Sequence, residues 1–167
     1  KDNPISDTFA LRALEMIMMN LEAACGEPAD LHAREQILLA SFYAGVAITA
    51  SGTTAVHALS YPLGGKYHIP HGVSNAIMLA PVMRFNEPDC RELLAAAYDR
   101  IADDGAAMTE EEKSGNLIKK LCRMVEVLEI PASLSVYGVS RDDLDVLVDA
   151  GMQVQRLLVN NRRTVTE

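Results

Sequence analysis

Apolar residues recur three and four positions apart along most of the chain, which is the spacing of one face of an α-helix. Residues 6–24 show this pattern first, with Ser6 or Asp7 as the predicted helix cap. Asp30 is the predicted cap of a second helix that runs to about residue 50. This helix is apolar on nearly all sides and is expected to be central in the fold. Small residues along it would let neighbouring helices approach closely: Ala40, Ala44, Gly45 and Ala47.

The second half of the chain shows the same helical spacing. Helices are predicted over residues 72–83, 88–102, 109–128 and 140–157. The last of them opens on Ser140-Arg-Asp-Asp, which resembles a capping box with Asp in place of Glu. No alternation typical of a strand is longer than four residues. Residues 1–167 are therefore predicted to form a single all-α, bundle-like domain of six to eight helices.

The stretch between these two halves has an unusually low content of charged residues. From Gln36 to Met83 the only formal charge is Lys66, so the segment is expected to be mostly buried. A short helix capped by Thr53 or Thr54 should carry His57 near its start. Pro62, Gly64 and Gly65 predict a loop, in which Lys66, Tyr67 and His68 would lie, and His71 stands at the mouth of the next helix. Imidazoles in such a stretch need partners, because an unpaired buried polar group costs roughly 1–3 kcal/mol.

Composition narrows the class of protein. The apolar fraction of 49% excludes a disordered chain, and the net charge of −8 argues against nucleic acid and against an anionic membrane surface as partners. The three cysteines are widely spaced and predict reduced thiols in a cytoplasmic protein rather than a disulfide framework. The uncharged residues 37–56 have the length of a membrane span, but Ser, Thr and Gly within them favour a buried helix instead.

His57 and His71 are candidate metal ligands, since neutral imidazole is a common ligand of zinc and ferrous iron. The alternative is a pair of core histidines bonded to the backbone. Two ligands are also too few for a catalytic site, which has at least three from protein, and no Asp or Glu lies between Gln36 and Met83. From spacing alone, both interpretations stay open. His32 is expected on a helix surface with no role.

A longer motif bears on this choice. It consists of Gly52, His57, Pro62-Leu63-Gly64, Pro70-His71-Gly72, Asn75-Ala76, Leu79, Pro81-Val82-Met83 and Asn86. It resembles the signature of the iron-containing (group III) alcohol dehydrogenases, and the flanking helices and the segment Asn160-Asn161-x-Arg163 are similar to that family as well. The resemblance covers nearly the whole chain, and its His, Pro and Gly pattern is specific.

The resemblance implies a domain like the helical domain of the dehydroquinate synthase-like fold, as the C-terminal part of a two-domain enzyme. His57 and His71 would be two of four ligands, one Asp and three His, to Fe²⁺ or Zn²⁺. The other two belong to an Asp-x-x-x-His motif that normally precedes the position of Lys1. NAD or NADP would be bound by the N-terminal domain, which this chain lacks together with its Gly-rich phosphate loop. The implied substrates are alcohols, aldehydes or ketones, and the implied assembly is a homo-oligomer.

One position departs from the family pattern. Tyr61 stands where relatives often have a second His before Pro-Leu-Gly. Its hydroxyl could donate or relay a proton, which makes it the candidate catalytic residue, although packing is an equal alternative. A different class of function also stays open for the chain by itself, namely a non-catalytic helical fragment that acts only as an interaction or oligomerisation module. A relative such as glycerol dehydrogenase is less favoured by the Pro-His-Gly-x-x-Asn-Ala run.

Overall fold

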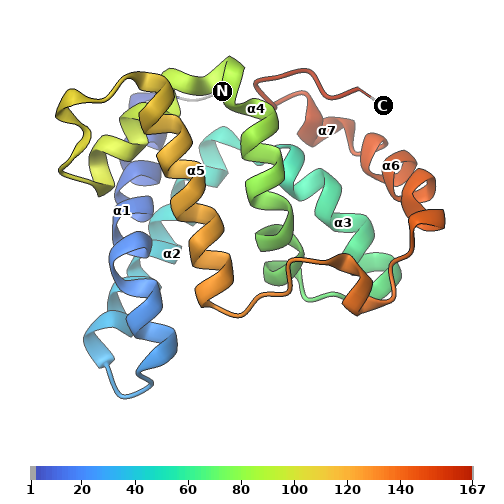
Figure 1. Ribbon diagram of the computed structural model, residues 1–167, viewed down its shortest axis with the longest axis horizontal. Helices are drawn as coiled ribbons and strands as arrows, with labels where there is room; N and C mark the ends of the chain where they lie inside the picture. The colour runs from blue at the N-terminus through green and yellow to red at the C-terminus, as the bar shows by residue number, and fades with distance from the viewer. Residues whose placement is uncertain (1–2, 167) are drawn as a thin grey trace. The chain divides into compact units, whose positions relative to one another are not determined.

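The computed structural model describes residues 3–166, and within that range it is helical and contains no strand (Figure 1). This confirms the predicted all-α class. The α-helices are α1 (Pro4–Gly26), α2 (Leu31–Ser51), α3 (Ala55–Tyr67), α4 (His71–Ile101), α5 (Glu110–Val127), α6 (Leu144–Met152) and α7 (Gln155–Leu158). Three short 3₁₀ helices are η1 (Gly105–Ala107), η2 (Leu134–Tyr137) and η3 (Arg141–Asp143).

The contacts within the chain divide it into two compact units. Unit 1 holds the described residues up to Gly52 together with Arg91–Leu117. Unit 2 holds Thr53–Cys90 and the described residues from Ile118 onward. Both candidate ligands belong to unit 2. The prediction of one domain over residues 1–167 stays a prediction.

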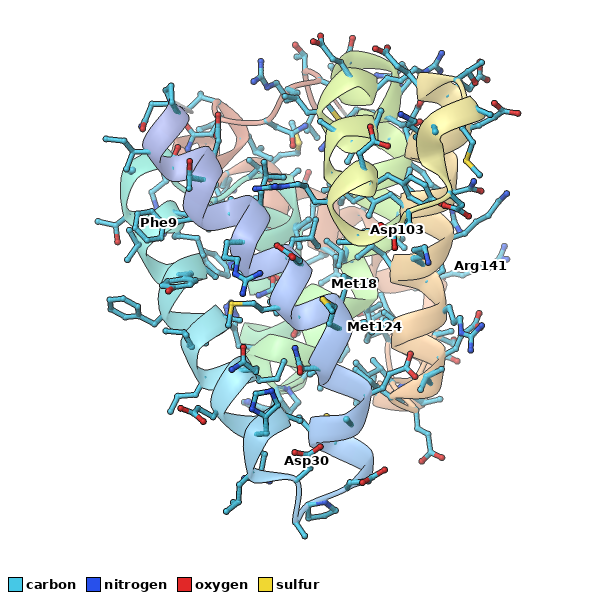
Figure 2. The ribbon with its side chains drawn as sticks, turned by 90° about the vertical axis from the view of Figure 1, so that its left-hand side faces the viewer. Phe9, Met18, Asp30, Asp103, Met124 and Arg141 are labelled. Carbon is cyan, nitrogen blue, oxygen red and sulfur yellow. The ribbon has the colours of Figure 1, made fainter. Side chains whose placement is uncertain are left out.

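Unit 1 is built on the antiparallel pair α1 and α2. Asp30 caps α2 as predicted, its carboxylate accepting from the Ala33 N–H at 2.9 Å, and Figure 2 shows it in the turn between the two helices. The cap of α1 is Asn3 rather than the predicted Ser6 or Asp7, because the Asn3 side chain accepts from the Ser6 N–H while the Ser6 hydroxyl accepts from the Asn3 N–H. Both helices therefore begin at sites fixed by local side-chain bonds.

Small residues let the two helices of unit 1 pack closely. Ala33, Ala40 and Ala47, seven residues apart, are the buried positions of α2. Gly45, predicted to take part in this contact, is exposed. On the other side of the pair, the ring of Phe9 lies 5.5 Å from that of Tyr43. Alanine spacing, rather than glycine, thus determines how closely the helices approach.

The expected burial of residues 36–83 is wrong for α2. Leu38 is 74% exposed and Phe42 64% exposed. The lack of charge in this helix is therefore not matched by burial, since one face packs on α1 and another is left uncovered. Among the described residues no single helix is long and apolar enough to cross a membrane, and only α2 and α3 taken together meet those criteria.

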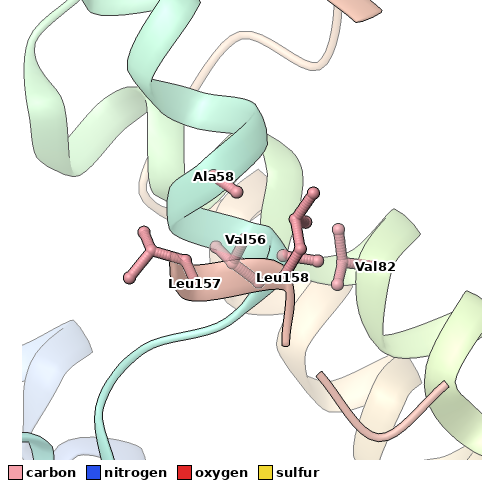
Figure 3. Packing of buried hydrophobic residues seen from close by; sticks show 6 residues of the cluster. Val56, Ala58, Val82, Leu157 and Leu158 are labelled. Atoms are coloured by element: carbon pink, nitrogen blue, oxygen red, sulfur yellow. The ribbon is translucent and has the colours of Figure 1, made fainter. Parts of the chain in front are cut away.

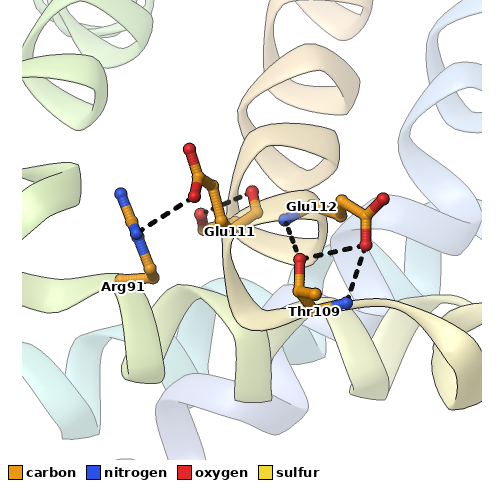
Figure 4. Close-up of polar contacts among 5 residues, drawn as sticks. Arg91, Thr109, Glu111 and Glu112 are labelled. Carbon is orange, nitrogen blue, oxygen red and sulfur yellow. Dashed lines mark hydrogen bonds and ion pairs between the residues drawn. The ribbon is translucent and has the colours of Figure 1, made fainter.

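Capping also sets the start of α5. The Glu112 carboxylate accepts from the Thr109 N–H at 2.8 Å and from its hydroxyl at 2.9 Å, and the Glu112 N–H donates to the same hydroxyl (Figure 4). Arg91 pairs with Glu111 beside it at 3.4 Å. The helix start predicted at Thr109 is confirmed.

The loop predicted at Pro62, Gly64 and Gly65 is wrong, because α3 continues through all three residues to Tyr67. Leu63 is 2% exposed and Ser60 is 1% exposed, so burial of this face stabilises the helix despite the missing N–H of proline. The helix ends at His68, which adopts a left-handed conformation at φ 56°. Lys66 and Tyr67 consequently lie in the last helical turn, not in a loop.

Two other predicted helix boundaries differ from those in the structure. The helices expected over residues 72–83 and 88–102 are one element, α4, with a non-helical residue at Cys90 (φ −143°, ψ 21°). The single helix expected over 140–157 is instead η3, α6 and α7. Its capping box is confirmed, since the Asp143 carboxylate accepts from the Ser140 N–H at 2.9 Å and from its hydroxyl at 2.7 Å.

Unit 2 has its core where α3 meets the C-terminal helices (Figure 3). The buried residues of this cluster are Ala55, Val56, Ala58, Val82, Leu157 and Leu158. Gly151 of α6 lies so close to α3 that a methyl group there would be 2.8 Å from Leu59 Cδ2. The first two turns of α3 thus pack against α6 and α7.

Candidate metal-binding site

His57 and His71 lie beside each other, although fourteen residues separate them in the chain. His57 is in the first turn of α3, and His71 is the first residue of α4. The centroids of their rings are 5.4 Å apart, and the ring planes are inclined by 57°. The helix-turn-helix from α3 to α4 therefore brings two imidazoles together at one place.

The turn between the two helices is fixed on the side away from the rings. Ile69 is buried at 3% exposure, and its carbonyl oxygen lies 3.3 Å from the Ser74 hydroxyl. Ser74 itself is fully buried, and its N–H donates to the Pro70 carbonyl at 2.9 Å. These contacts set where α4 begins, and hence where His71 stands.

A third side chain faces both rings. Asn75 follows His71 by one turn of α4, and its Nδ2 lies 3.0 Å from His71 Nε2 and 3.4 Å from His57 Nε2. Its Oδ1 lies 2.6 Å from the Ser60 hydroxyl of α3. The Nε2 atoms of the two histidines thus point toward the same end of one amide group. Motif and spacing arguments gave Ser60 and Asn75 no role, although their positions, three after His57 and four after His71, place them on the same helix faces.

The electrostatics favour a neutral imidazole at His57. Burial lowers the pKa of His57 below its ordinary value of 6.5, and the nearby charge that His71 carries when protonated lowers it further. A neutral imidazole has a free lone pair on one ring nitrogen, which is the form that binds a metal. The arrangement is thus ready to donate electron pairs near neutral pH.

Tyr61 lies beside the two histidines. Its ring centroid is 6.3 Å from that of His57, with the planes nearly perpendicular at 89°, and 6.0 Å from that of His71. Tyr61 is 38% exposed, so part of the residue is open to solvent. Tyr61 therefore lies next to both candidate metal ligands.

The other residues singled out from the sequence do not face this site. Lys66 pairs with Asp143 at 2.6 Å, and this contact, with the Ser140 bonds, holds the pKa of the Asp143 carboxyl well below its usual value. The hydroxyl of Tyr67 is buried without a hydrogen-bond partner among the described residues, and burial raises its pKa. His32 is exposed on α2, as expected. The Lys66–Asp143 pair thus stabilises the end of α3, and none of these three side chains faces the histidine pair.

The donor set suits a divalent transition metal in part. Within residues 3–166, no three His, Cys, Asp or Glu side chains are grouped so as to hold an ion. Two imidazole Nε2 atoms directed at one point are nevertheless typical ligands of ferrous iron and zinc. The two histidines fit such an ion and would supply part of its coordination.

Comparison with known proteins finds one family that matches the whole chain. The model of the Fe-containing alcohol dehydrogenase family, C-terminal part, matches residues 1–167. The long-chain-alcohol dehydrogenase 1 of Geobacillus thermodenitrificans is 33% identical over 159 residues, which are 95% of this chain and 40% of that enzyme.

Solved structures agree with this match. A crystal structure of 1,3-propanediol oxidoreductase superposes with a TM-score of 0.94 at 29% identity, over 98% of this chain and 43% of that one. A sulfoacetaldehyde reductase from Bifidobacterium kashiwanohense, solved with NAD⁺, gives a TM-score of 0.81 at 26% identity, over 98% and 41%. The chain therefore spans about two-fifths of the length of these relatives.

Proposed function

Because the chain belongs to the Fe-containing alcohol dehydrogenase family, whose C-terminal part it matches throughout, we propose that it forms the metal-holding part of an enzyme interconverting alcohols with aldehydes or ketones. The observation that carries this proposal is the convergence of His57 Nε2 and His71 Nε2 on one point in unit 2. The relatives that the chain matches are dehydrogenases, which gives no support to the non-catalytic interaction module.

In this proposal, His57 and His71 are ligands of Fe²⁺ or Zn²⁺ through their Nε2 atoms. When bound, such an ion supplies Lewis acidity to an alcohol or carbonyl oxygen. The burial that keeps His57 neutral preserves the lone pair it needs for this task. Val56, which precedes His57, and Ile69, two residues before His71, are both buried, so the backbone that carries the two rings is fixed without a metal.

Tyr61 is the proposed proton donor or relay for the substrate oxygen. Its ring lies about 6 Å from both imidazoles, and part of the residue is open to solvent. A phenol hydroxyl can donate a hydrogen bond to a substrate oxygen, which is the role proposed for Tyr61.

Three further proposals concern the hydride carrier, the assembly and the location of the enzyme. NAD or NADP is the proposed hydride carrier, in line with the NAD⁺ complex of the sulfoacetaldehyde reductase, and it would bind to a part of the enzyme outside these residues. A homo-oligomer is proposed because α2 exposes Leu38 and Phe42. A cytoplasmic location is proposed because Cys25, Cys90 and Cys122 are all free thiols.

Metal titration of histidine variants tests the central point. Calorimetry with Fe²⁺ under anaerobic conditions, and with Zn²⁺, should show a site in the chain that His57→Ala and His71→Ala each weaken by at least about 10-fold. His32→Ala is the matched control, since this exposed imidazole lies on α2 in unit 1. Equal affinities for all three variants would show that the two histidines do not hold the ion.

A further inference from the structure

Asn160 is hydrogen-bonded to the chain just before α3, the helix that carries His57. Its side-chain nitrogen lies 3.3 Å from the Thr53 carbonyl oxygen and 3.4 Å from that of Arg156. An amide nitrogen has two protons and can donate to both carbonyls, which fixes the orientation of this amide. Asn160 therefore ties the segment after α7 to the residue that leads into α3.

The residues that follow Asn160 are anchored on α4, the helix that carries His71. Asn161 and Asn86 exchange two amide hydrogen bonds, of 2.6 Å and 3.0 Å, and Asn86 is 5% exposed. The Arg163 guanidinium donates to the Phe85 carbonyl at 3.0 Å and lies 4.6 Å from the centre of the Phe85 ring. Residues 160–163 thus connect the start of α3 to α4, and all of these contacts lie within unit 2.

The start of α3 lacks the local cap that α1 and α2 have. Its N-cap residue Thr54 makes no side-chain cap hydrogen bond, whereas Asn3 and Asp30 cap their helices. His57 lies in this uncapped first turn, and its N–H donates to the Thr54 carbonyl at 3.1 Å. A first turn without a cap frays more readily, and fraying here would displace the His57 ring. The position of that ring therefore depends on contacts from outside the helix.

His57 is also at the end of α3 that is farther from the connection to α4. That connection begins at His68, eleven residues after His57 and roughly 15 Å away along the helix. Thr53, in contrast, precedes His57 by only four residues. Burial of Val56 holds this end in the core, but apolar burial is not directional, whereas hydrogen bonds fix an orientation. The Asn160 contact is thus the directional restraint near the His57 ring.

We propose that Asn160 and Asn161 are positioning residues of the metal site. They hold the first turn of α3 against α4 and so keep the His57 ring beside that of His71. The proposal rests on the proposed metal-binding function and adds no ligand to it. The competing interpretation is that residues 160–163 stabilise the fold in general, with no particular effect on the rings.

Hydrogen exchange of backbone amides, without any metal, tests the restraint on α3. Asn160→Ala should speed exchange of the His57 and Ala58 amides by about 5-fold, the effect of losing one bond at a helix start. The Arg34 amide, in the first turn of α2, is the internal control and should not change. Unchanged exchange at His57 and Ala58 would show that Asn160 does not hold this turn, which overturns the proposal.

Titration of the full chain with Co²⁺ tests the effect on the site, because the visible bands of this ion depend on the geometry of its ligands. Asn160→Ala and Asn161→Ala should each weaken the affinity by roughly 3-fold or more and shift the bands. This is less than the 10-fold typical of a direct partner of a metal ligand, because both act through the backbone.

Two controls separate positioning from general stability. Val159→Ala changes the neighbouring residue, which is 72% exposed, and should bind Co²⁺ like the unaltered chain. Met16→Ala removes a side chain that is 2% exposed in α1 of unit 1, so it should destabilise the fold and leave the Co²⁺ bands in place. If Met16→Ala weakened binding as much as Asn160→Ala, general stability would explain the loss and the proposal would be wrong.

The remaining outcomes separate the positioning proposal from the function on which it rests. If His57→Ala weakens Co²⁺ binding while Asn160→Ala and Asn161→Ala do not, the two asparagines are not positioning residues and the metal function stands. If His57→Ala binds Co²⁺ like the unaltered chain, the metal function is wrong and the positioning proposal falls with it. Far-ultraviolet circular dichroism checks that each variant keeps its helices. Should Asn161→Ala lose them, Asn160→Ala decides the question alone.

Discussion

Truncating Leu157 tests how the C-terminal helix α7 supports the histidine site. Leu157 is 5% exposed and belongs to the same buried cluster as Val56, the residue before His57. Leu→Ala changes in cores remove about 2–5 kcal/mol, through lost burial and the cavity left behind. Leu157→Ala should therefore lower the free energy of unfolding by about 3 kcal/mol.

The assay is urea denaturation followed by far-ultraviolet circular dichroism. With a slope of about 1–3 kcal/mol per molar urea, a loss of about 3 kcal/mol moves the midpoint down by roughly 1–3 M. Val159→Ala is the matched control, since Val159 lies two residues away but is 72% exposed, and its change should stay within about 0.5 kcal/mol. If Leu157→Ala moved the midpoint no further than Val159→Ala, the packing of α7 on α3 described above would be refuted.

Three further predictions concern activity and pH. These 167 residues by themselves should show no alcohol dehydrogenase turnover with added Fe²⁺ or Zn²⁺, NAD or NADP and short alcohols, because they span only about two-fifths of the length of the relatives and the nicotinamide is proposed to bind outside them. Turnover that is abolished by His57→Ala would contradict this prediction. The pKa of His57 is lowered in the folded state, so the unfolded chain binds a proton more readily and the free energy of unfolding should fall as the pH drops below about 6.5. His57→Gln should make the free energy of unfolding, measured by urea titration, depend less on pH in that range. The pKa of the Asp143 carboxyl is lowered in the folded state, so its stabilising effect should be complete above pH 3.8, the ordinary pKa, and be lost in acid. The difference in unfolding free energy between the unaltered chain and Asp143→Asn should therefore be smaller at pH 3 than at pH 7.

Helix starts were the most predictable part of this fold, because capping is decided by residues close in sequence. Asp30 and Thr109 open the helices expected of them, whereas Ser140 forms its capping box but opens the 3₁₀ helix η3 instead of the expected α-helix. Helix ends and breaks were less predictable. Pro62 reads as a stop in isolation, yet buried Ser60 and Leu63 carry α3 through it, since tertiary packing outweighs one lost backbone bond.

Sequence reasoning predicted some of the residues of the candidate site but not the contacts between them. His57, His71 and Tyr61 could be picked from motif and chemistry, and they lie together. Asn75 belonged to the same motif but had no role assigned to it, and Ser60 was not singled out, because the contact between them forms only when the faces of α3 and α4 meet after the turn at His68. The exposed face of α2 was missed for another reason. Absence of charge does not distinguish a covered helix from an uncovered apolar one.

The site also has a distinctive place in the order of folding. Its contacts join residues fourteen to eighteen positions apart, such as Ser60 with Asn75 and His57 with Asn75. The reciprocal amide pair of Asn86 and Asn161, in contrast, closes a loop of 75 residues. Short loops close with little entropy loss and on fast timescales, so the two imidazoles are expected to meet before the C-terminal segment docks. A nascent chain would then bring these two proposed ligands together before the C-terminal segment docks, so a metal could bind them during folding.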